Sequence, residues 1–306
     1  MDTVEWSNSK QRPYWVVNGK SVWNQDKFGS DAIAKTFNAS ASVKEPAENG
    51  AVLIMRRKCN DIKRIIFDRF VGAGAHLEVG VGRGGDLGKI RNAARSNGVA
   101  CSRIIGVDIA SGALEEARRR DALVHKSGAT LGLLNMCEDW TETTKNLLRS
   151  YNLRTAGLMF CMHYAETNPD TFAENLGAVM GEGSILFGVV PDPFVVKKYL
   201  EDGITSPFSS NKDLVIKETF PGFYKFGLGN IIVDLVEPIL NLSRLELSLE
   251  RRGFFLREFI LCKDPENIGL GLYSVFFFTR VHKIPPVIAH KEKKRQKPIN
   301  NAKKPF

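Results

Sequence analysis

Apolar and polar positions follow two rhythms along the middle of the chain. Short aliphatic runs, typical of buried strands, alternate with longer stretches in which apolar residues recur at helical spacing. A helical pattern over 49–70 precedes this alternation. Because regular strand–helix alternation is typical of a parallel sheet wrapped by helices, we expect an α/β fold. The expected strands are 75–80, 103–108, 129–136, 155–162 and 184–190, and the expected helices are 86–97, 111–120, 140–150 and 168–180.

The rhythm changes after the fifth expected strand. Residues 191–240 carry two or three β-rich stretches separated by Pro and Gly. A helical pattern at 241–252 is then followed by two long strand patterns, at 254–262 and 271–281. This ending fits an antiparallel hairpin that closes a mostly parallel sheet. We therefore expect 191–240 to be a β-rich insertion over the carboxyl ends of the strands, where ligands of open α/β sheets bind.

A glycine-rich turn follows the first strand of the alternation. Residues 76–88 read HLEVGVGRGGDLG, so the strand breaks at Gly80 and Gly82 and a helix opens at Asp86. Glycines let the backbone turn sharply and approach a ligand without an intervening Cβ atom. This stretch is the strongest functional signal in the chain.

Two carboxylates near this turn indicate which nucleoside it suits. Glu78 precedes Gly80 by two positions, and Asp108 closes the next strand, where a carboxylate suits a ribose diol. The glycine spacing also fits the G-x-G-x-x-G pattern of NAD-binding proteins. However, Glu78 would repel a pyrophosphate and attract the sulfonium and ammonium groups of S-adenosylmethionine. We favour S-adenosylmethionine, with NAD and a purely structural glycine turn as the alternatives.

Composition narrows the class of protein. A chain of 306 residues with 43% hydrophobic content can bury a large core. No apolar run approaches the roughly 20 residues that cross a bilayer, and the N-terminus shows no secretory signal, so we expect no membrane association. Five cysteines without a C-x-x-C pair indicate a reducing compartment, no disulfide framework and no zinc site. We expect no metal.

The two ends of the chain differ from its middle. Residues 283–306 hold eight Lys or Arg and one Glu, so this segment carries seven of the nine net positive charges. It is expected to be a disordered basic arm for nucleic acid or another polyanion, or a solubilising or nuclear-import tail. Residues 1–35 hold three of the four tryptophans and are expected to be an aromatic extension that packs on the main domain or on a partner. The domain between them spans 36–282.

The order of motifs over roughly 37–281 resembles the eukaryotic and viral mRNA cap guanine (N-7) methyltransferases. The family's donor motif, an acidic residue before G-x-G-[KR]-G-G-D-L, is matched from Glu78 to Leu87, and Asn60 with Lys63 matches an upstream Asn and Lys. The resemblance implies a class I S-adenosylmethionine-dependent methyltransferase with a Rossmann-like, mostly parallel seven-stranded sheet and the insertion after strand five. It implies these cofactor-binding residues: Lys63, Glu78, Gly80, Gly82, Asp86, Asp108, Asn135 and Met159.

At two of these positions, the group that contacts the adenine of the donor has alternatives. Asn135, Glu138 and Asp139 are alternative contacts for the adenine of the donor. Met159 stands where the family has Gln, and a thioether cannot donate a hydrogen bond and accepts one only weakly. We therefore expect backbone atoms at Met159 to serve the adenine.

The same resemblance implies a cap-binding set. His163 and Tyr164 end the string MFCMHY and would touch the cap guanine, with Tyr164 also near the donor. Pro191 would pack on the base, and Tyr273 would cover it as an aromatic lid. Glu237 takes the position of a family Glu and is the candidate acceptor for the amide and amine donors of guanine. Charge-assisted hydrogen bonds from these two donors would select guanine over other bases.

The implied activity is transfer of a methyl group from S-adenosylmethionine to the cap guanine N7 of RNA, leaving S-adenosylhomocysteine. Because that nitrogen already has a free lone pair, we expect positioning and electrostatics without a general base, and no catalytic acid–base residue. Another class I methyltransferase, acting on RNA or a small molecule, and a non-catalytic subunit with the same fold are the alternatives.

The expected partners are capped RNA and other capping-enzyme domains or subunits. The expected location is the nucleus or cytoplasm, or a virus factory or virion if the protein is viral. Cellular and viral origins look alike in this sequence.

Overall fold

The computed structural model describes the backbone of residues 3–7, 12–17, 20–22, 34–35, 38, 50–98, 101–229 and 232–281. The basic segment 283–306 lies outside the described residues. Three short strands near the N-terminus form a small antiparallel sheet: β1 (Thr3–Ser7), β2 (Arg12–Val17) and β3 (Lys20–Val22). The expected packing of the N-terminal tryptophans involves side chains outside the described set, so it stays a prediction.

A mostly parallel sheet of seven strands organises the described part of the chain, in the order β12-β13-β8-β7-β4-β5-β6. The strands from β4 to β8 run parallel, whereas β13 pairs antiparallel with both β8 and β12. The expected sheet with a terminal antiparallel hairpin is thereby confirmed. The strands are β4 (Gly74–Val79), β5 (Cys101–Asp108), β6 (Thr130–Leu133), β7 (Leu153–Met159), β8 (Met180–Pro191), β12 (Phe254–Leu261) and β13 (Tyr273–Arg280).

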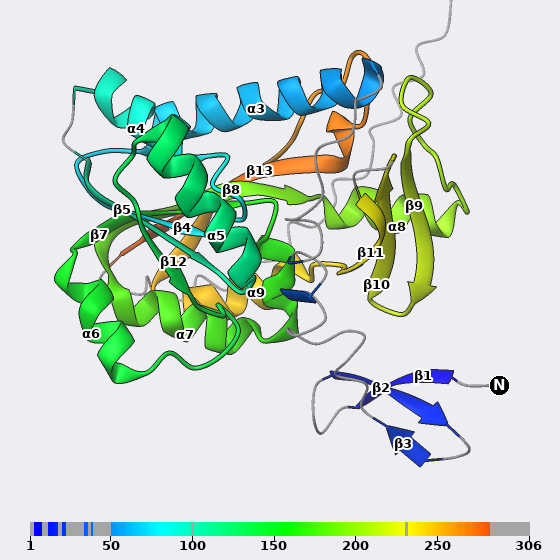
Figure 1. Ribbon diagram of the computed structural model, residues 1–306. Helices are drawn as coiled ribbons and strands as arrows, with labels where there is room; N and C mark the ends of the chain where they lie inside the picture. Colours follow the sequence, from blue (N-terminus) through cyan, green and yellow to red (C-terminus); the bar gives the residue numbers. More distant parts are fainter. Residues whose placement is uncertain are drawn as a thin grey trace, which may run out of the picture.

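Helices cover both faces of this sheet (Figure 1). One face carries α3 (Gly50–Phe70), α4 (Leu87–Ser96) and α5 (Ser111–Arg120), which share a core cluster with Phe187 of β8. The opposite face carries α6 (Glu142–Ser150), α7 (Pro169–Val179) and α9 (Leu242–Glu250), which share a second cluster with Leu77 of β4. None of the helices in the described ranges has the length and apolar character needed to cross a membrane.

Local capping residues explain where several helices begin. Thr141 accepts a hydrogen bond from the backbone N–H of Thr144 at the start of α6. Asn168 does the same for Thr171 at the start of α7, where Pro169 takes the first helical position. These contacts satisfy N–H groups that have no partner within the helix.

The segment after β8 is a compact unit of one helix and three strands. It contains α8 (Pro193–Glu201) and then an antiparallel sheet in the order β11-β10-β9. Its strands are β9 (Leu214–Phe220), β10 (Phe223–Leu228) and β11 (Ile232–Pro238). In Figure 1 the unit lies at the end of the main sheet toward which β8 points, as expected for an insertion over the carboxyl ends of the strands.

The three strands agree with the two or three β-rich stretches expected in 191–240, and helix α8 is an additional element that was not expected there. The Asp192 carboxylate accepts hydrogen bonds from the N–H groups of Phe194 and Val195, and Pro193 occupies the first turn. An Asp followed by Pro is a strong helix start, and here it overrides the strand preference of the following valines.

Two expected strands end earlier than the sequence pattern indicates. Strand β6 stops at Leu133 rather than 136, and the residues that follow enter a loop. Strand β7 stops at Met159 rather than 162, because Phe160 adopts a positive φ of 64°. A 3₁₀ turn then spans Met162–Thr167, so His163 and Tyr164 lie on this turn.

Candidate active site

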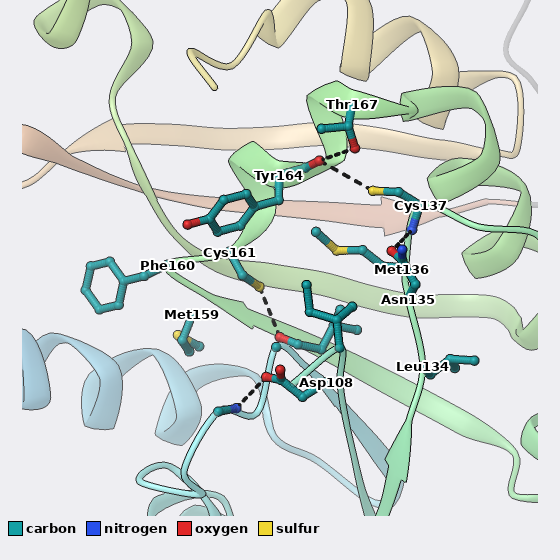
Figure 2. Close-up of a pocket in the computed structure, with 14 residues that line it drawn as sticks. Asp108, Leu134, Asn135, Met136, Cys137, Met159, Phe160, Cys161, Tyr164 and Thr167 are labelled. Atoms are coloured by element: carbon teal, nitrogen blue, oxygen red, sulfur yellow. Dashed lines mark hydrogen bonds between the residues drawn. The ribbon is translucent and has the colours of Figure 1, made fainter. Parts of the chain in front are cut away.

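A cavity of about 210 Å³ opens at the carboxyl ends of β4, β5, β6 and β7 (Figure 2). Strand order reverses between β4 and β7, and ligands of open α/β sheets bind at such a switch point. The lining comes from the glycine turn, from the ends of β5 and β7, from the loop after β6 and from the 3₁₀ turn. It consists of Val79, Gly80, Gly82, Asp108, Ile109, Leu134, Asn135, Met136, Cys137, Met159, Phe160, Cys161, Tyr164 and Thr167.

The glycine turn presents bare backbone to this cavity. Gly80 and Gly82 have φ angles of 69° and 52°, a conformation that residues with a Cβ atom rarely adopt. A Cβ on Gly80 would lie 2.8 Å from the Cys161 sulfur, whereas a Cβ on Gly82 would meet nothing within 4 Å. Gly80 therefore allows close packing against the end of β7, and Gly82 leaves open space for a ligand.

Asp108 ties this turn to the end of β5. Its two carboxylate oxygens accept hydrogen bonds from the N–H of Gly82, at 2.7 Å, and from the N–H of Ala110, at 2.9 Å. Burial raises the pKa of Asp108, and these amide hydrogen bonds oppose that rise. The carboxylate thus sits on the cavity wall in a fixed orientation (Figure 2).

The loop after β6 places Asn135 on the opposite side of the cavity. Its side chain accepts a hydrogen bond from the N–H of Cys137 and donates one to Glu138, and its carbonyl accepts one from the Trp140 indole. Of the three alternatives considered for adenine contact, only Asn135 lines the cavity. Met159 also lines it, from the end of β7.

Lys63, Asp86 and Glu78 lie near the glycine turn but do not line the cavity. Lys63 of α3 reaches Asp86 at 2.6 Å, and Lys89 reaches the second oxygen of the same carboxylate at 2.7 Å. Burial would raise the pKa of Asp86, but the two lysines outweigh it and leave the pKa lowered. The Lys63 ammonium also lies 5.0 Å from the ring centroid of Phe160, which does line the cavity.

Glu237 forms the centre of a second, buried polar cluster. The hydroxyl of Tyr224 donates to Glu237 Oε2 at 2.5 Å, and that of Tyr164 donates to Oε1 at 3.3 Å. His163 Nε2 lies 3.6 Å from the same Oε1. Burial would raise the pKa of Glu237, but His163 and the two hydroxyls outweigh it and lower the pKa.

Tyr164 connects the two regions. It lines the cavity (Figure 2) and also donates to Glu237, so the cavity and the carboxylate cluster share one side chain. Burial and the nearby Glu237 raise the pKa of the Tyr164 phenol well above its ordinary value. Its hydroxyl therefore acts as a neutral hydrogen-bond donor.

Pro191 and Tyr273 are register partners on β8 and β13, next to this cluster. The Tyr273 ring packs edge-on against Phe160, with ring centroids 4.9 Å apart. Burial raises the pKa of the Tyr273 phenol, and Glu237 contributes to that rise. Asp192 links β13 to the start of α8. One of its carboxylate oxygens accepts a 2.6 Å hydrogen bond from the Ser274 hydroxyl, and the other caps α8.

Three residues of this region were not expected from the sequence. Tyr224 on β10 is the cross-strand partner of Glu237, Phe160 lies three residues before His163, and His76 contacts Glu78. Tyr224 had a usable signal, since alternation along FYKFGL places it on the same face as Phe226. Its pairing with Glu237 depends on the register of two strands. Within the described ranges, no group of three or more His, Cys, Asp or Glu side chains is arranged to hold a metal ion.

Comparison with known proteins finds mRNA cap methyltransferases among the chain's relatives. The model of the mRNA (guanine-N(7))-methyltransferase domain matches residues 23–232. The mRNA cap guanine-N(7) methyltransferase of Cryptococcus neoformans var. neoformans serotype D (strain JEC21) is 25% identical over 199 residues, covering 61% of this chain and 31% of that protein. The mRNA cap guanine-N(7) methyltransferase 1 of Oryza sativa subsp. japonica is 24% identical over 196 residues, covering 60% of this chain and 51% of that protein.

The chain therefore spans from a third to half of the length of these two relatives. Among solved structures, a chain from the complex between the Haloferax volcanii Trm112 methyltransferase activator and a proposed methyltransferase superposes with a TM-score of 0.50 at 12% identity. The match covers 80% of this chain and 98% of that one. At this identity the likeness shows the fold alone.

Proposed function

This chain belongs to the mRNA (guanine-N(7))-methyltransferase domain family, and we propose that it transfers a methyl group from S-adenosylmethionine to N7 of the cap guanine of RNA. Its fold is that of a class I S-adenosylmethionine-dependent methyltransferase. One observation carries the proposal beyond the family match. Tyr164 both lines the cavity beside the glycine turn and donates to the buried Glu237, so a donor site and a base-recognition site would meet at this residue.

The residues around the cavity fit a nucleoside donor. Gly82 faces open space, the Asp108 carboxylate suits ribose hydroxyls, and Asn135 with Met159 would border the adenine. Lys63, Asp86 and Glu78, together with the backbone of Gly80, would set the charge at the amino-acid end. When bound, S-adenosylmethionine supplies an electrophilic methyl group on a sulfonium.

The Glu237 cluster fits the edge of a guanine. Each carboxylate oxygen receives one tyrosine hydroxyl and keeps a second acceptor position for the amide and amine donors of the base. Each such charge-assisted bond contributes about 1.5 to 3 kcal/mol. The lowered pKa of Glu237 keeps this acceptor ionised. Pro191, Tyr164 and Tyr273 would stack against the base at roughly 1 to 3 kcal/mol, a range measured for single-stranded nucleic acids.

His163 supports a ligand on this side of the cluster. Its side chain is only 1% exposed, its Nδ1 has no hydrogen-bond partner among the described residues, and its Nε2 lies 3.6 Å from Glu237 Oε1, beyond hydrogen-bond distance. A buried polar group without a partner costs free energy, so it is favoured where a ligand completes the hydrogen bond. We assign His163 to the cap guanine.

Methyl transfer to guanine N7 requires these residues to position the base and the donor, and it requires no proton transfer. Guanine N7 already carries its lone pair, so no base must remove a proton before attack. Holding the nitrogen in line with the methyl carbon supplies the main advantage, and a site with fixed dipoles suits a sulfonium that loses its charge. Tyr164, with its raised phenol pKa, would hold its place through a hydrogen bond and remain neutral.

Capped RNA is the proposed partner, and other capping-enzyme domains or subunits are proposed as further ones. The nuclear, cytoplasmic or viral location stays a prediction.

The test is transfer of a labelled methyl group from S-adenosylmethionine to RNA with an unmethylated cap, followed by nuclease digestion to locate the label. We expect the label on cap guanine N7. Glu237→Gln is the matched variant, and it should lose transfer while keeping affinity for S-adenosylhomocysteine in calorimetry. Label at another position would favour a different methyltransferase. Donor uptake without any transfer would favour a non-catalytic subunit.

A further inference from the structure

A fully buried histidine lies beneath the glycine turn, outside the roles described above. His76 is on β4, two residues before Glu78, so both side chains project from the same face of the strand toward β7. His76 Nε2 lies 3.0 Å from Glu78 Oε2, and His76 Nδ1 lies 2.8 Å from the Thr155 hydroxyl. The imidazole thus links a carboxylate of the donor motif to a neighbouring strand.

Strand β7 is shaped to receive this pair. The parallel register sets Thr155 opposite His76 and Gly157 opposite Glu78. A Cβ atom on Gly157 would collide with Glu78 Oε2 and lie 3.2 Å from His76 Nε2. The strand therefore offers a hydroxyl where the imidazole needs a partner, and free space where the carboxylate must fit.

Aromatic packing restricts the imidazole to one orientation. Phe67 of α3 and Phe187 of β8 contact it, with ring centroids 6.1 and 5.8 Å away. With Glu78 ionised, only a proton on Nε2 makes the shared hydrogen bond, because a carboxylate can only accept. Thr155 completes the arrangement in either charge state of the ring, since a hydroxyl can donate to Nδ1 or accept from it.

The charge on Glu78 depends on this neighbour. Burial raises the pKa of Glu78, and the hydrogen bond and charge of His76 oppose the rise. Asp86 also raises this pKa and Lys63 lowers it, but Lys63 is paired with Asp86 at 2.6 Å. The Cys161 thiol, just after β7, donates to the Val79 carbonyl at 3.0 Å, and the nearby Glu78 helps burial to raise the pKa of that thiol. Among the described residues, His76 is the hydrogen-bond partner of the Glu78 carboxylate.

We propose that His76 is a positioning residue of the donor site, holding the Glu78 carboxylate in one orientation and in its charged form beneath the turn. A negative charge there attracts the sulfonium and ammonium groups of S-adenosylmethionine. The proposal rests on the donor half of the proposed function and is independent of the cap.

Calorimetry of S-adenosylmethionine binding, without RNA, tests this role for His76→Phe between about pH 6 and about pH 9. The ammonium of the donor titrates in the same range, so the measured quantity is the ratio of variant to wild-type Kd at each pH. Without His76 the pKa of Glu78 rises and the carboxyl is neutral at lower pH. We expect a ratio of about tenfold or more at the acid end that falls as pH rises.

Three further variants separate positioning from packing. His76→Gln, whose amide can donate to Glu78, should bind within about threefold of wild type. Phe67→Leu trims the packing around His76 and should lower Tm, with a Kd ratio that does not change with pH. In a Glu78→Gln background, His76→Phe should change the Kd no further, because its effect acts through Glu78.

The outcomes are distinct. A Kd ratio that stays near one, or that is constant with pH as for Phe67→Leu, overturns the role of His76. If His76→Phe does not fold, Thr155→Val takes its place, and its ratio of variant to wild-type Kd should be smaller but should also fall as pH rises. A Kd ratio for Thr155→Val that does not change with pH also overturns the role of His76. Wild-type protein that takes up no donor overturns this inference and the proposed function together. Donor uptake with the expected His76 pattern but no transfer to capped RNA refutes only the proposed function.

Discussion

Tyr224→Phe removes one hydroxyl from the Glu237 cluster and leaves the aromatic packing in place. Tyr224 is 1% exposed, and its hydroxyl lies 2.5 Å from Glu237 Oε2. The other two neighbours of this carboxylate are farther away, with Tyr164 at 3.3 Å and His163 at 3.6 Å. Tyr224 therefore makes the shortest of the three contacts that hold the proposed guanine acceptor.

The expected magnitude follows from these distances. A hydrogen bond to a charged group contributes about 1.5 to 3 kcal/mol, and the shortest of three contacts belongs in the upper half of that range. Because about 1.4 kcal/mol corresponds to a factor of ten, kcat/KM for the cap should fall roughly 40- to 140-fold. Affinity for the donor should stay within about twofold, since Tyr224 does not line the cavity beside the glycine turn.

The pH dependence adds a second readout. The folded protein lowers the pKa of Glu237, and Tyr224 is one cause. A carboxylate with a lowered folded pKa contributes stability above its unfolded pKa and loses it as pH falls through the folded pKa. Removing the hydroxyl raises the folded pKa. Cap use by Tyr224→Phe should therefore begin to fall at a higher pH than cap use by the wild-type protein.

The assay is steady-state methylation of an unmethylated cap analogue at saturating S-adenosylmethionine, together with calorimetry of S-adenosylhomocysteine. Tyr199→Phe is the matched control, because Tyr199 lies on α8 and packs against Phe208 away from the Glu237 cluster. The reasoning is refuted if Tyr224→Phe keeps kcat/KM for the cap within about twofold of wild type. Equal losses of cap use and donor affinity would refute it as well.

Three further predictions test other parts of the molecule. Asp108→Ala should weaken donor binding by about tenfold or more in calorimetry, whereas Glu237→Ala should spare the donor and reduce cap use; parallel losses in both assays would contradict two separate sites. Gly157→Ala should destabilise the protein by about 1 to 3 kcal/mol in thermal unfolding, because the new Cβ collides with Glu78, and an unchanged Tm would show that the strand can yield. Deleting 283–306 should flatten the salt dependence of RNA affinity without altering turnover of a cap analogue, and an unchanged slope would remove the segment from RNA binding.

Much of the fold follows from local patterns. The expected helices over 111–120 and 140–150 agree with α5 and α6 to within two residues, because each is set by apolar periodicity and its flanking signals. Helix α8 was not expected, although Asp192 and Pro193 together form a helix-start signal. The early end of β7 was missed because the positive φ of Phe160 has no signature in the sequence.

The candidate site was predicted unevenly. Gly80, Gly82, Asp108, Asn135 and Met159 all line one cavity, as expected of residues at the carboxyl ends of neighbouring parallel strands. The remaining expected donor residues lie behind or beside it, held by ion pairs and hydrogen bonds within the protein. Their contacts with the donor stay predictions.

The sequence by itself determined features that depend on neighbouring residues: the glycine turn, the helix starts, the alternation of strands and helices, and the order of motifs that marks the family. Only the tertiary structure decided which polar groups pair. His76 meets Thr155 across 79 positions, and Tyr164 meets Glu237 across 73. The physical reason is that a buried polar group must find a partner, and which one it finds depends on strand register and helix packing, which bring distant segments together.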